Sequence, residues 1–351
     1  MAAEIQISSR RIGAGQPCYI IAELSANHGQ SFEKALEVVR AAKDAGADAI
    51  KLQTYTADTL TLDCRRPEFM VGKGTLWEGK NLHDLYAEAY TPWEWQPELK
   101  KEAESLGLHC FSTPFDDTAV DFLEGMNVPA HKIASFELVD TQLLKKVAAT
   151  GKPVIMSTGM ASFEEIEEAV QILRTNGCTQ LALLKCTSAY PSLPEDMNLR
   201  TIPHMAESFD LPVGLSDHTL GTAVPVAAVA LGACIIEKHL TMRRSDGGPD
   251  GAFSLEPDEF RSMVEAVRVA EKSLGKVCYE LSEKEQASRA FRRSLFVVED
   301  VKKGEKFTRA NVRSIRPGYG LPVKRLHNIL GREAKSDVRR GTPLSSDLFE
   351  P

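Results

Sequence analysis

The chain has 351 residues, of which 43% are hydrophobic and 26% are charged, and its formal net charge is −7. This composition is typical of a globular protein, and the length allows one large domain and one small domain. The charge is uneven, because residues 286–351 hold 15 Lys and Arg against 7 Asp and Glu, which leaves the remainder strongly acidic. The basic residues are spread out without interleaved aromatics, which argues against nucleic-acid binding.

The seven cysteines are odd in number and scattered, and several lie in apolar runs. This distribution argues against a disulfide framework and favours a reducing compartment. The first eleven residues are polar and form no apolar leader, and no run of about 18 apolar residues occurs. We therefore expect a cytoplasmic protein with no membrane partner.

Short apolar runs with β-forming residues recur through the first three quarters of the chain. We expect eight strands, at Tyr19–Leu24, Asp48–Leu52, Leu108–Ser112, Ala130–Ala134, Pro153–Ser157, Gln180–Lys185, Pro212–Leu215 and Ala233–Lys238. Segments between them, such as 31–45 and 163–173, have the apolar spacing of helices. Eight nearly continuous apolar strands that alternate with helices favour a parallel (β/α)8 TIM barrel. No G-x-G-x-x-G follows the first strand, which argues against a dinucleotide-binding fold.

The segment between the second and third expected strands is unusually long and contains Trp77, Trp93 and Trp95. An aromatic insertion at the C-terminal end of a barrel strand can form a lid or a substrate wall. It can equally pack on the rim of the barrel, and the sequence leaves both alternatives open.

A second pattern begins after a helix expected at 256–274. Residues 275–290 are polar and are typical of a linker, and the remainder combines a strand at 294–298, a glycine turn at 300–306 and a short helix at 326–331. We therefore expect a barrel domain over 1–275, a linker over 276–289 and a small α+β domain over 290–351.

Polar residues stand at the C-terminal end of every expected strand, which is where barrel active sites are built. They are Glu23, Lys51 with Gln53, Thr113, Lys132 with Ser135 and Glu137, Ser157, Lys185 with Thr187, Ser216 with His218, and Glu237 with Lys238 and His239. Some polar residues would surface there in any barrel. The convergence of lysines, histidines and carboxylates on one end favours a catalytic site.

His218 and His239 follow consecutive strands, so both imidazoles can approach one metal ion. No third histidine or cysteine stands beside them in the sequence, which favours a harder ion than zinc, completed by water or substrate oxygen. Lysines and serines from four strands would form a phosphate cradle without a P-loop. These residues are Lys51, Lys132, Ser135, Ser157 and Ser216.

At these positions the sequence resembles the sialic acid synthase family. The motifs that carry the resemblance are IAELSANH (21–28), AIKLQT (49–54), FSTPF (111–115), KIASFE (132–137), STGM (157–160), KCTSAYP (185–191), GLSDHTL (214–220) and EKH (237–239). Residues 301–305 and RPGYG (316–320) resemble the C-terminal antifreeze-like (SAF) domain of that family. The resemblance covers essentially the whole chain and is specific as a set of motifs.

The resemblance implies an enzyme that condenses phosphoenolpyruvate with an N-acylated amino sugar, with Glu23, Glu137 and Lys51 as catalytic residues. It implies that His218 and His239 hold manganese, with magnesium or cobalt as alternatives. Phosphoenolpyruvate would lie in the cradle described above, and the residues on the side of the carbonyl and the sugar would be Glu23, Gln53, Thr113, Glu137, Ser188, Tyr190 and Asp250. The family also implies a domain-swapped homodimer in which Arg316 acts in the active site of the partner.

Within the family, AELSANH, KIASFE and residues 72–95 are most similar to the pseudaminic branch, whose sugar is 2,4-diacetamido-2,4,6-trideoxy-L-altrose. The alternative is an N-acetylneuraminate or legionaminic acid synthase that uses N-acetylmannosamine or a diacetamido sugar derived from bacillosamine. Two further classes remain open. One is a metal-dependent aldolase that shares the cradle, and the other is a binding protein whose C-terminal domain recognises a carbohydrate or ice. The latter would need a Thr-rich face, and residues 286–351 contain only two threonines.

Overall fold

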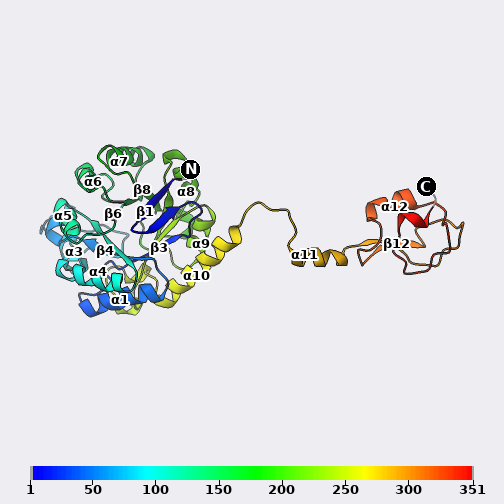
Figure 1. The fold of residues 1–351 in the computed structure, drawn as a ribbon. Helices are drawn as coiled ribbons and strands as arrows, with labels where there is room; N and C mark the ends of the chain where they lie inside the picture. Colours follow the sequence, from blue (N-terminus) through cyan, green and yellow to red (C-terminus); the bar gives the residue numbers. More distant parts are fainter. Residues whose placement is uncertain (1–2, 350–351) are drawn as a thin grey trace. The chain divides into compact units, whose positions relative to one another are not determined.

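The computed structural model describes residues 3–349. The chain divides into two compact units, Met1–Gly275 and Lys276–Pro351, which are treated separately below (Figure 1). The first unit is a closed barrel whose strands follow the order β10-β3-β4-β5-β6-β7-β8-β9, with every neighbouring pair parallel. The expected TIM-barrel fold is confirmed.

All eight expected strands form within about two residues of the positions read from the sequence. They are β3 (Tyr19–Glu23), β4 (Ala49–Thr54), β5 (His109–Pro114), β6 (His131–Ile133), β7 (Val154–Ser157), β8 (Leu181–Cys186), β9 (Val213–Asp217) and β10 (Ile235–His239). The helices that follow them are α1 (Phe32–Asp44), α4 (Gln96–Ser105), α5 (Asp117–Gly125), α6 (Thr141–Ala148), α7 (Phe163–Thr175), α8 (Thr201–Phe209), α9 (Ala223–Ala230) and α10 (Pro257–Leu274).

Alternate residues of each strand point to opposite faces, so the barrel has two separate apolar cores. Outward-facing residues such as Ile20, Ile50 and Leu183 pack against the helices. Inward-facing residues such as Ile21 and Phe111 fill the N-terminal half of the barrel interior. Farther along the same inward faces the side chains become polar, and these polar positions form the C-terminal end of the barrel, here called the mouth.

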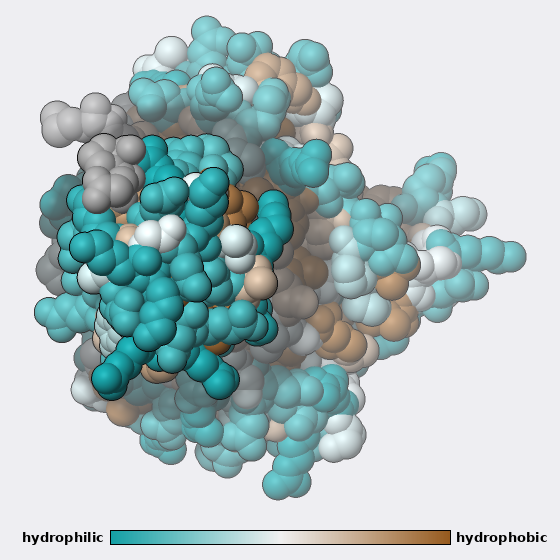
Figure 2. Space-filling model, turned by 90° about the vertical axis from the view of Figure 1, so that its right-hand side faces the viewer, coloured by the Kyte–Doolittle hydropathy of each residue, from teal (hydrophilic) through white to brown (hydrophobic). Residues whose placement is uncertain are grey.

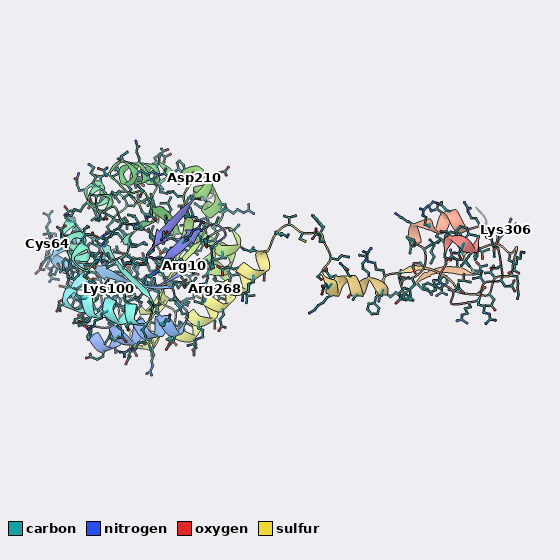
Figure 3. All side chains as sticks on the ribbon, viewed as in Figure 1. Arg10, Cys64, Lys100, Asp210, Arg268 and Lys306 are labelled. Atoms are coloured by element: carbon teal, nitrogen blue, oxygen red, sulfur yellow. The ribbon has the colours of Figure 1, made fainter. Side chains whose placement is uncertain are left out.

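A hairpin closes the N-terminal end of the barrel, and it was not predicted from the sequence. Strands β1 (Glu4–Ile7) and β2 (Arg10–Gly13) pair antiparallel, and their isoleucines join the inner core. Arg10 of the hairpin and Arg268 of α10, both labelled in Figure 3, lie 3.9 and 3.1 Å from carboxylate oxygens of Asp48. The hairpin is therefore fixed by both apolar packing and charge.

The insertion between β4 and β5 contains the short helices α2 (Ala57–Leu60) and α3 (Leu82–Ala89). Trp93 donates its indole N–H to the Tyr55 carbonyl at 3.0 Å, and the Trp95 ring lies 5.7 Å from that of Phe32, so these two tryptophans pack on the rim. Trp77 differs, because it reaches toward the mouth. Trp93 and Trp95 therefore follow the rim-packing alternative, and a lid or substrate wall stays a prediction for the part of the insertion that holds Trp77.

The second unit contains a two-stranded sheet and its own small core. Strand β11 (Ser294–Val297) pairs antiparallel with β12 (Val312–Ile315), and the short helix α12 (Leu326–Ile329) contributes Ile329 to the same core. Its face in Figure 2 is mainly hydrophilic. The segment interpreted as a linker contains helix α11 (Glu283–Ser288), which begins at a capping box between Ser282 and Glu285.

All seven cysteines are free. Across residues 3–349, no helix is both long and apolar enough to cross a membrane.

Candidate active site

The candidate site lies at the mouth of the barrel, where the inward faces of the strands carry polar side chains. The strand-end residues expected from the sequence that point into this space are Glu23, Lys51, Gln53, Thr113, Lys132, Ser157, Ser216, Glu237 and His239. The parallel register aligns them because the C-terminal ends of neighbouring strands meet at the same edge. Gly214 allows this closeness, since a Cβ there would clash with the backbone of Ile235 on β10.

Two glutamates and two lysines form a buried charge network at the centre of the mouth. Lys51 pairs with Glu23, and its Nζ donates to Thr113 Oγ1 at 3.2 Å. Glu237 Oε1 lies 3.9 Å from Lys51 Nζ and 3.7 Å from Lys132 Nζ. All four side chains are buried. An anion that enters the mouth therefore competes with the two carboxylates for the two lysines.

The side of the network nearest β7 carries donors suited to a phosphate. Lys132 Nζ donates to Ser157 Oγ at 2.6 Å, and Ser216 Oγ donates to Glu237 Oε1 at 3.1 Å. Burial lowers the pKa of Lys132. Burial alone would raise the pKa of Glu237, but Lys132 and Lys51 hold it below its usual range. Ammonium and hydroxyl donors from β4, β6, β7 and β9 thus converge, as a phosphate cradle requires.

Two further serines meet over the backbone of Gly159. The amide of Gly159 donates to Ser135 Oγ at 3.0 Å, and a Cβ at this position would clash with the hydroxyls of both Ser135 and Ser188. A residue with a Cβ would force both hydroxyls to move, so glycine lets them approach the backbone in this arrangement. The loops after β6, β7 and β8 are thereby joined at one point.

A chain of hydrogen bonds extends from the charge network toward the rim. Gln53 Nε2 donates to Glu23 Oε1 at 3.2 Å and to Ser25 Oγ at 2.8 Å, and Ser25 Oγ donates to the Asp250 carboxylate. Burial raises the pKa of Asp250. These amide, hydroxyl and carboxyl groups have the chemistry that binds sugar hydroxyls.

Aromatic rings form a wall beside these polar groups. The Tyr190 ring centroid lies 4.5 Å from that of His218, 5.0 Å from that of Phe253 and 5.6 Å from that of Trp77. Trp77 donates its indole N–H to the Pro249 carbonyl at 2.9 Å, which ties the insertion to the loop after β10. The indole ring is consequently fixed at the edge of the mouth.

His218 and His239 lie side by side, with ring centroids 5.4 Å apart. His218 Nδ1 donates to the Thr187 carbonyl at 3.1 Å, which leaves Nε2 as the lone-pair nitrogen. Burial, assisted by the nearby His218, lowers the pKa of His239 far below its usual value, so this imidazole is neutral. Its Nδ1 is buried without a hydrogen-bond partner among residues 3–349. These two nitrogens fit a divalent cation whose other positions are taken by water and substrate oxygen.

Within the described residues, no group of three His, Cys, Asp or Glu side chains converges as a complete ligand set. Although no cysteine stands beside the histidines in the sequence, Cys186 lies beside them in space, with Sγ 3.9 Å from His218 Nδ1. The register that pairs Cys186 with Ser216 places it there, and this register is not visible in the sequence. Although burial opposes ionisation, the hydrogen bond with His218 lowers the pKa of the Cys186 thiol to about 7.

Two carboxyl groups of the mouth titrate near neutrality. Burial raises the pKa of Glu23 to about 7, against the opposing effect of Lys51. Burial likewise raises the pKa of Glu137 to about 7, and Glu137 Oε2 is buried with no hydrogen-bond partner in the described part of the chain. Each group can donate or accept a proton at neutral pH.

The structure adds three residues to the site that were not predicted as site residues from the sequence: Glu237, Ser25 and Trp77. Glu237 was visible at a strand end, but its role as the counter-ion of two lysines depends on the register of three strands. Ser25 and Trp77 lie in loops, where no periodic pattern marks them. Arg316 is exposed and belongs to the second unit, so its role in an active site stays a prediction.

Two protein-family models and several known proteins are similar to this chain. Residues 38–279 match the NeuB family, and residues 292–350 match the SAF domain. A pseudaminic acid synthase of Campylobacter jejuni is 46% identical over 95% of this chain and 96% of its own length, and one from Helicobacter pylori is 44% identical over 95% and 98%. A crystal structure of the N-acetylneuraminic acid (sialic acid) synthetase of Leptospira borgpetersenii, in complex with citrate, superposes with a TM-score of 0.73 at 34% identity, covering 82% of this chain and 95% of the other.

Proposed function

The chain belongs to the NeuB family, and from this membership we propose that it is a transferase that makes pseudaminic acid from phosphoenolpyruvate and 2,4-diacetamido-2,4,6-trideoxy-β-L-altropyranose. C3 of phosphoenolpyruvate bonds to the aldehyde carbon of the sugar, water adds at C2, and the bond from C2 to the phosphate oxygen breaks. The observation that carries the proposal is the buried network of Lys51, Lys132, Glu23 and Glu237 in a chain 44 to 46% identical to two pseudaminic acid synthases.

Phosphoenolpyruvate binds at Lys51, Lys132, Ser135, Ser157 and Ser216. The hydrogen bond between Lys132 and Ser157 orients both donors before the substrate arrives, which lowers the entropic cost of binding. The incoming phosphate competes with Glu237 for the two lysines and for the Ser216 hydroxyl, which donates to the carboxylate in the absence of substrate.

A divalent cation completes the site. We assign manganese, with magnesium or cobalt as alternatives, to His218 and His239, and when bound it polarises the carbonyl oxygen of the sugar. His218 is oriented for this by its hydrogen bond to the Thr187 carbonyl, and His239 presents a neutral ring.

Glu137 and Glu23 move the protons. Glu137 is the candidate that takes the proton of the water added at C2, since its Oε2 has no competing partner among the described residues. Glu23 holds sugar hydroxyls together with Gln53, Thr113 and Asp250. Their pKa values, each about 7, allow either group to exchange a proton near neutral pH.

The sugar lies between the hydrogen-bonded groups of Gln53, Ser25 and Asp250 on one side and the aromatic wall on the other. Ser188 and Tyr190 contact it from the loop after β8. The Trp77 and Phe253 rings of the wall suit the methyl group at C6 of a 6-deoxy sugar, because Phe253 has no polar side-chain atom and the Trp77 indole N–H is already bonded to the Pro249 carbonyl. The alternative sugars are those of the N-acetylneuraminate and legionaminic acid synthases.

The catalytic unit is a domain-swapped homodimer, with domains at 1–275 and 290–351 joined by a linker at 276–289. Arg316 of the C-terminal domain enters the mouth of the partner barrel. Large apolar residues support an interface, because Phe136, Met160 and Leu220 are more than half exposed in loops after the barrel strands, and Phe291 and Tyr319 are similarly exposed in the second unit. The free cysteines accord with the reducing conditions of the cytoplasm.

The test is a reaction of the purified chain with phosphoenolpyruvate, manganese and a panel of amino sugars, in which products are identified by mass and released phosphate is counted. We expect one nonulosonic acid per phosphate, and we expect the 6-deoxy diacetamido altrose to be used about a hundredfold better than N-acetylmannosamine. Equal turnover of the two sugars would leave only the general synthase activity. Carbon–carbon bond formation without phosphate release would identify an aldolase instead.

A further inference from the structure

A fully buried ion pair lies on the opposite side of the barrel wall from the two histidines. Asp217 on β9 and Lys238 on β10 are direct partners in the strand register, and Lys238 Nζ donates to Asp217 Oδ2 at 2.5 Å. Both side chains have 0% exposure. The preceding pair in the register, Ser216 and Glu237, points into the mouth, so Asp217 and Lys238 point outward under the helices.

The contacts of this ion pair surround His218 along the chain. Lys238 Nζ also donates to the carbonyl of Thr219, and the amide of Thr219 donates to Asp217 Oδ1 at 2.9 Å. The residues immediately before and after His218 are therefore both bound to Lys238. Since Lys238 itself immediately precedes His239, one ammonium group links the backbone positions of the two histidines.

Stability alone is a weak reason for such a pair. Removing two charges from water costs several kcal/mol per ion, and replacing a buried ion pair with uncharged groups of similar size is often neutral or stabilising. Asp217 and Lys238 also lie outside the mouth, so they contact neither substrate. What the pair does supply is a fixed distance between the ends of β9 and β10.

We propose that Asp217 and Lys238 are positioning residues of the metal site, which hold His218 and His239 at the spacing and orientation that one divalent cation requires. This inference rests on the metal site of the proposed function. The pair acts through the two histidines, as groups behind metal ligands commonly do. Four of the five residues assigned to phosphoenolpyruvate lie on other strands or in the loops after them, and the fifth, Ser216 on β9, points to the opposite face from Asp217. Phosphoenolpyruvate binding should therefore not depend on the pair.

The experiment measures Mn2+ binding to the full-length protein by electron paramagnetic resonance, without either substrate. The test variant is the double substitution Asp217→Asn, Lys238→Met, which removes both buried charges and keeps an oxygen to accept the Thr219 amide. The matched control is Asp48→Asn, Arg268→Met at the N-terminal end of the barrel, which removes an ion pair far from the histidines. The reference for a lost site is His239→Ala.

We expect the Kd for Mn2+ to rise about tenfold or more in the test variant and to stay within about twofold in the control. The Kd for phosphoenolpyruvate, measured with chelator present, should stay within about twofold in both. If the test variant does not fold, Asp217→Asn alone replaces it, with an expected weakening of about threefold or more.

A folded test variant with the Mn2+ affinity of the wild type overturns the inference, and so does a parallel loss of phosphoenolpyruvate affinity, which would indicate general loosening of the mouth. Equal Mn2+ binding by the wild type and His239→Ala would instead overturn the metal assignment, and the inference with it. These outcomes separate a failure of the positioning role from a failure of the proposed site.

Discussion

Replacing Lys132 with methionine should weaken phosphoenolpyruvate binding without disturbing the barrel. Lys132 Nζ lies 2.6 Å from Ser157 Oγ and 3.7 Å from Glu237 Oε1, and the residue is 2% exposed. Methionine retains the length and most of the volume of the lysine side chain, so the substitution removes the charge and little packing. Glu237 keeps one cation, because Lys51 Nζ remains 3.9 Å away.

The size of the effect follows from the burial of this ammonium group. A charge-assisted hydrogen bond to phosphate in a sheltered site contributes about 1.5–3 kcal/mol. At about 1.4 kcal/mol per decade, the Kd for phosphoenolpyruvate should rise between roughly tenfold and a hundredfold. Isothermal titration of the purified variant measures this directly, and a thermal melt monitors the fold.

Lys185→Met is the matched control for this measurement. Lys185 stands near the end of β8, two strands from β6, but its Nζ donates to the Cys186 carbonyl at 2.7 Å and to Thr187 Oγ1 at 3.1 Å, so it is bound to its own loop. The control should bind phosphoenolpyruvate within about twofold of the wild type, since no phosphate contact is lost. Wild-type affinity in a folded Lys132→Met protein would place the phosphate elsewhere in the mouth.

Three other outcomes are expected. The His218→Ala, His239→Ala double variant should lose metal-dependent turnover at least about a hundredfold yet still bind phosphoenolpyruvate. Normal metal-dependent rates in this variant would show that other residues bind the cation. Burial raises the pKa of Glu137 to about 7, so the neutral acid stabilises the fold at low pH, and this stability is lost as the pH rises from the usual carboxyl pKa through 7. Between about pH 5 and 8 the thermal midpoint of Glu137→Gln should therefore fall less than that of the wild type, and parallel melting curves would contradict the shift. Mixing inactive Arg316→Ala with inactive His239→Ala protein should restore activity. In a mixed dimer, the intact barrel of the Arg316→Ala subunit receives the intact C-terminal domain of the His239→Ala subunit. Mixtures that exchange subunits and stay inactive would argue against a shared site.

The barrel could be predicted from the sequence because its signals are local and repeated. Each strand is an apolar run buried on both faces, and polar residues mark the point where it reaches the mouth. The hairpin at residues 4–13 escaped notice because its strands have four residues each and alternate with polar ones. Helix α11 was not predicted because it is polar along its whole length, and only the capping box at Ser282 and Glu285 indicates it in the sequence.

The sequence predicts which residues belong to the candidate site, but it does not predict which of them contact one another. The rule that barrel sites form at strand ends selects Lys51 and Lys132 from the sequence. It does not say that Glu237 is shared between them, or that Cys186 adjoins His218, because both contacts depend on how neighbouring strands are staggered. The sequence also gives no sign that Trp77 reaches the loop after β10, since a loop residue has no periodic pattern to fix its direction.

The N-terminal hairpin has a consequence for the order in which the chain folds. Ile5, Ile7 and Ile12 share a core with Ile235 on the last strand of the barrel, although more than two hundred residues separate them along the chain. The hairpin is made before β10, yet the surface that buries its isoleucines is complete only after β10 has been made. Contacts so distant in sequence close late and slow the search for the native state. During synthesis the hairpin therefore waits for the last strand of the barrel before it is buried, and a nascent chain that stops before β10 keeps these isoleucines exposed to chaperones.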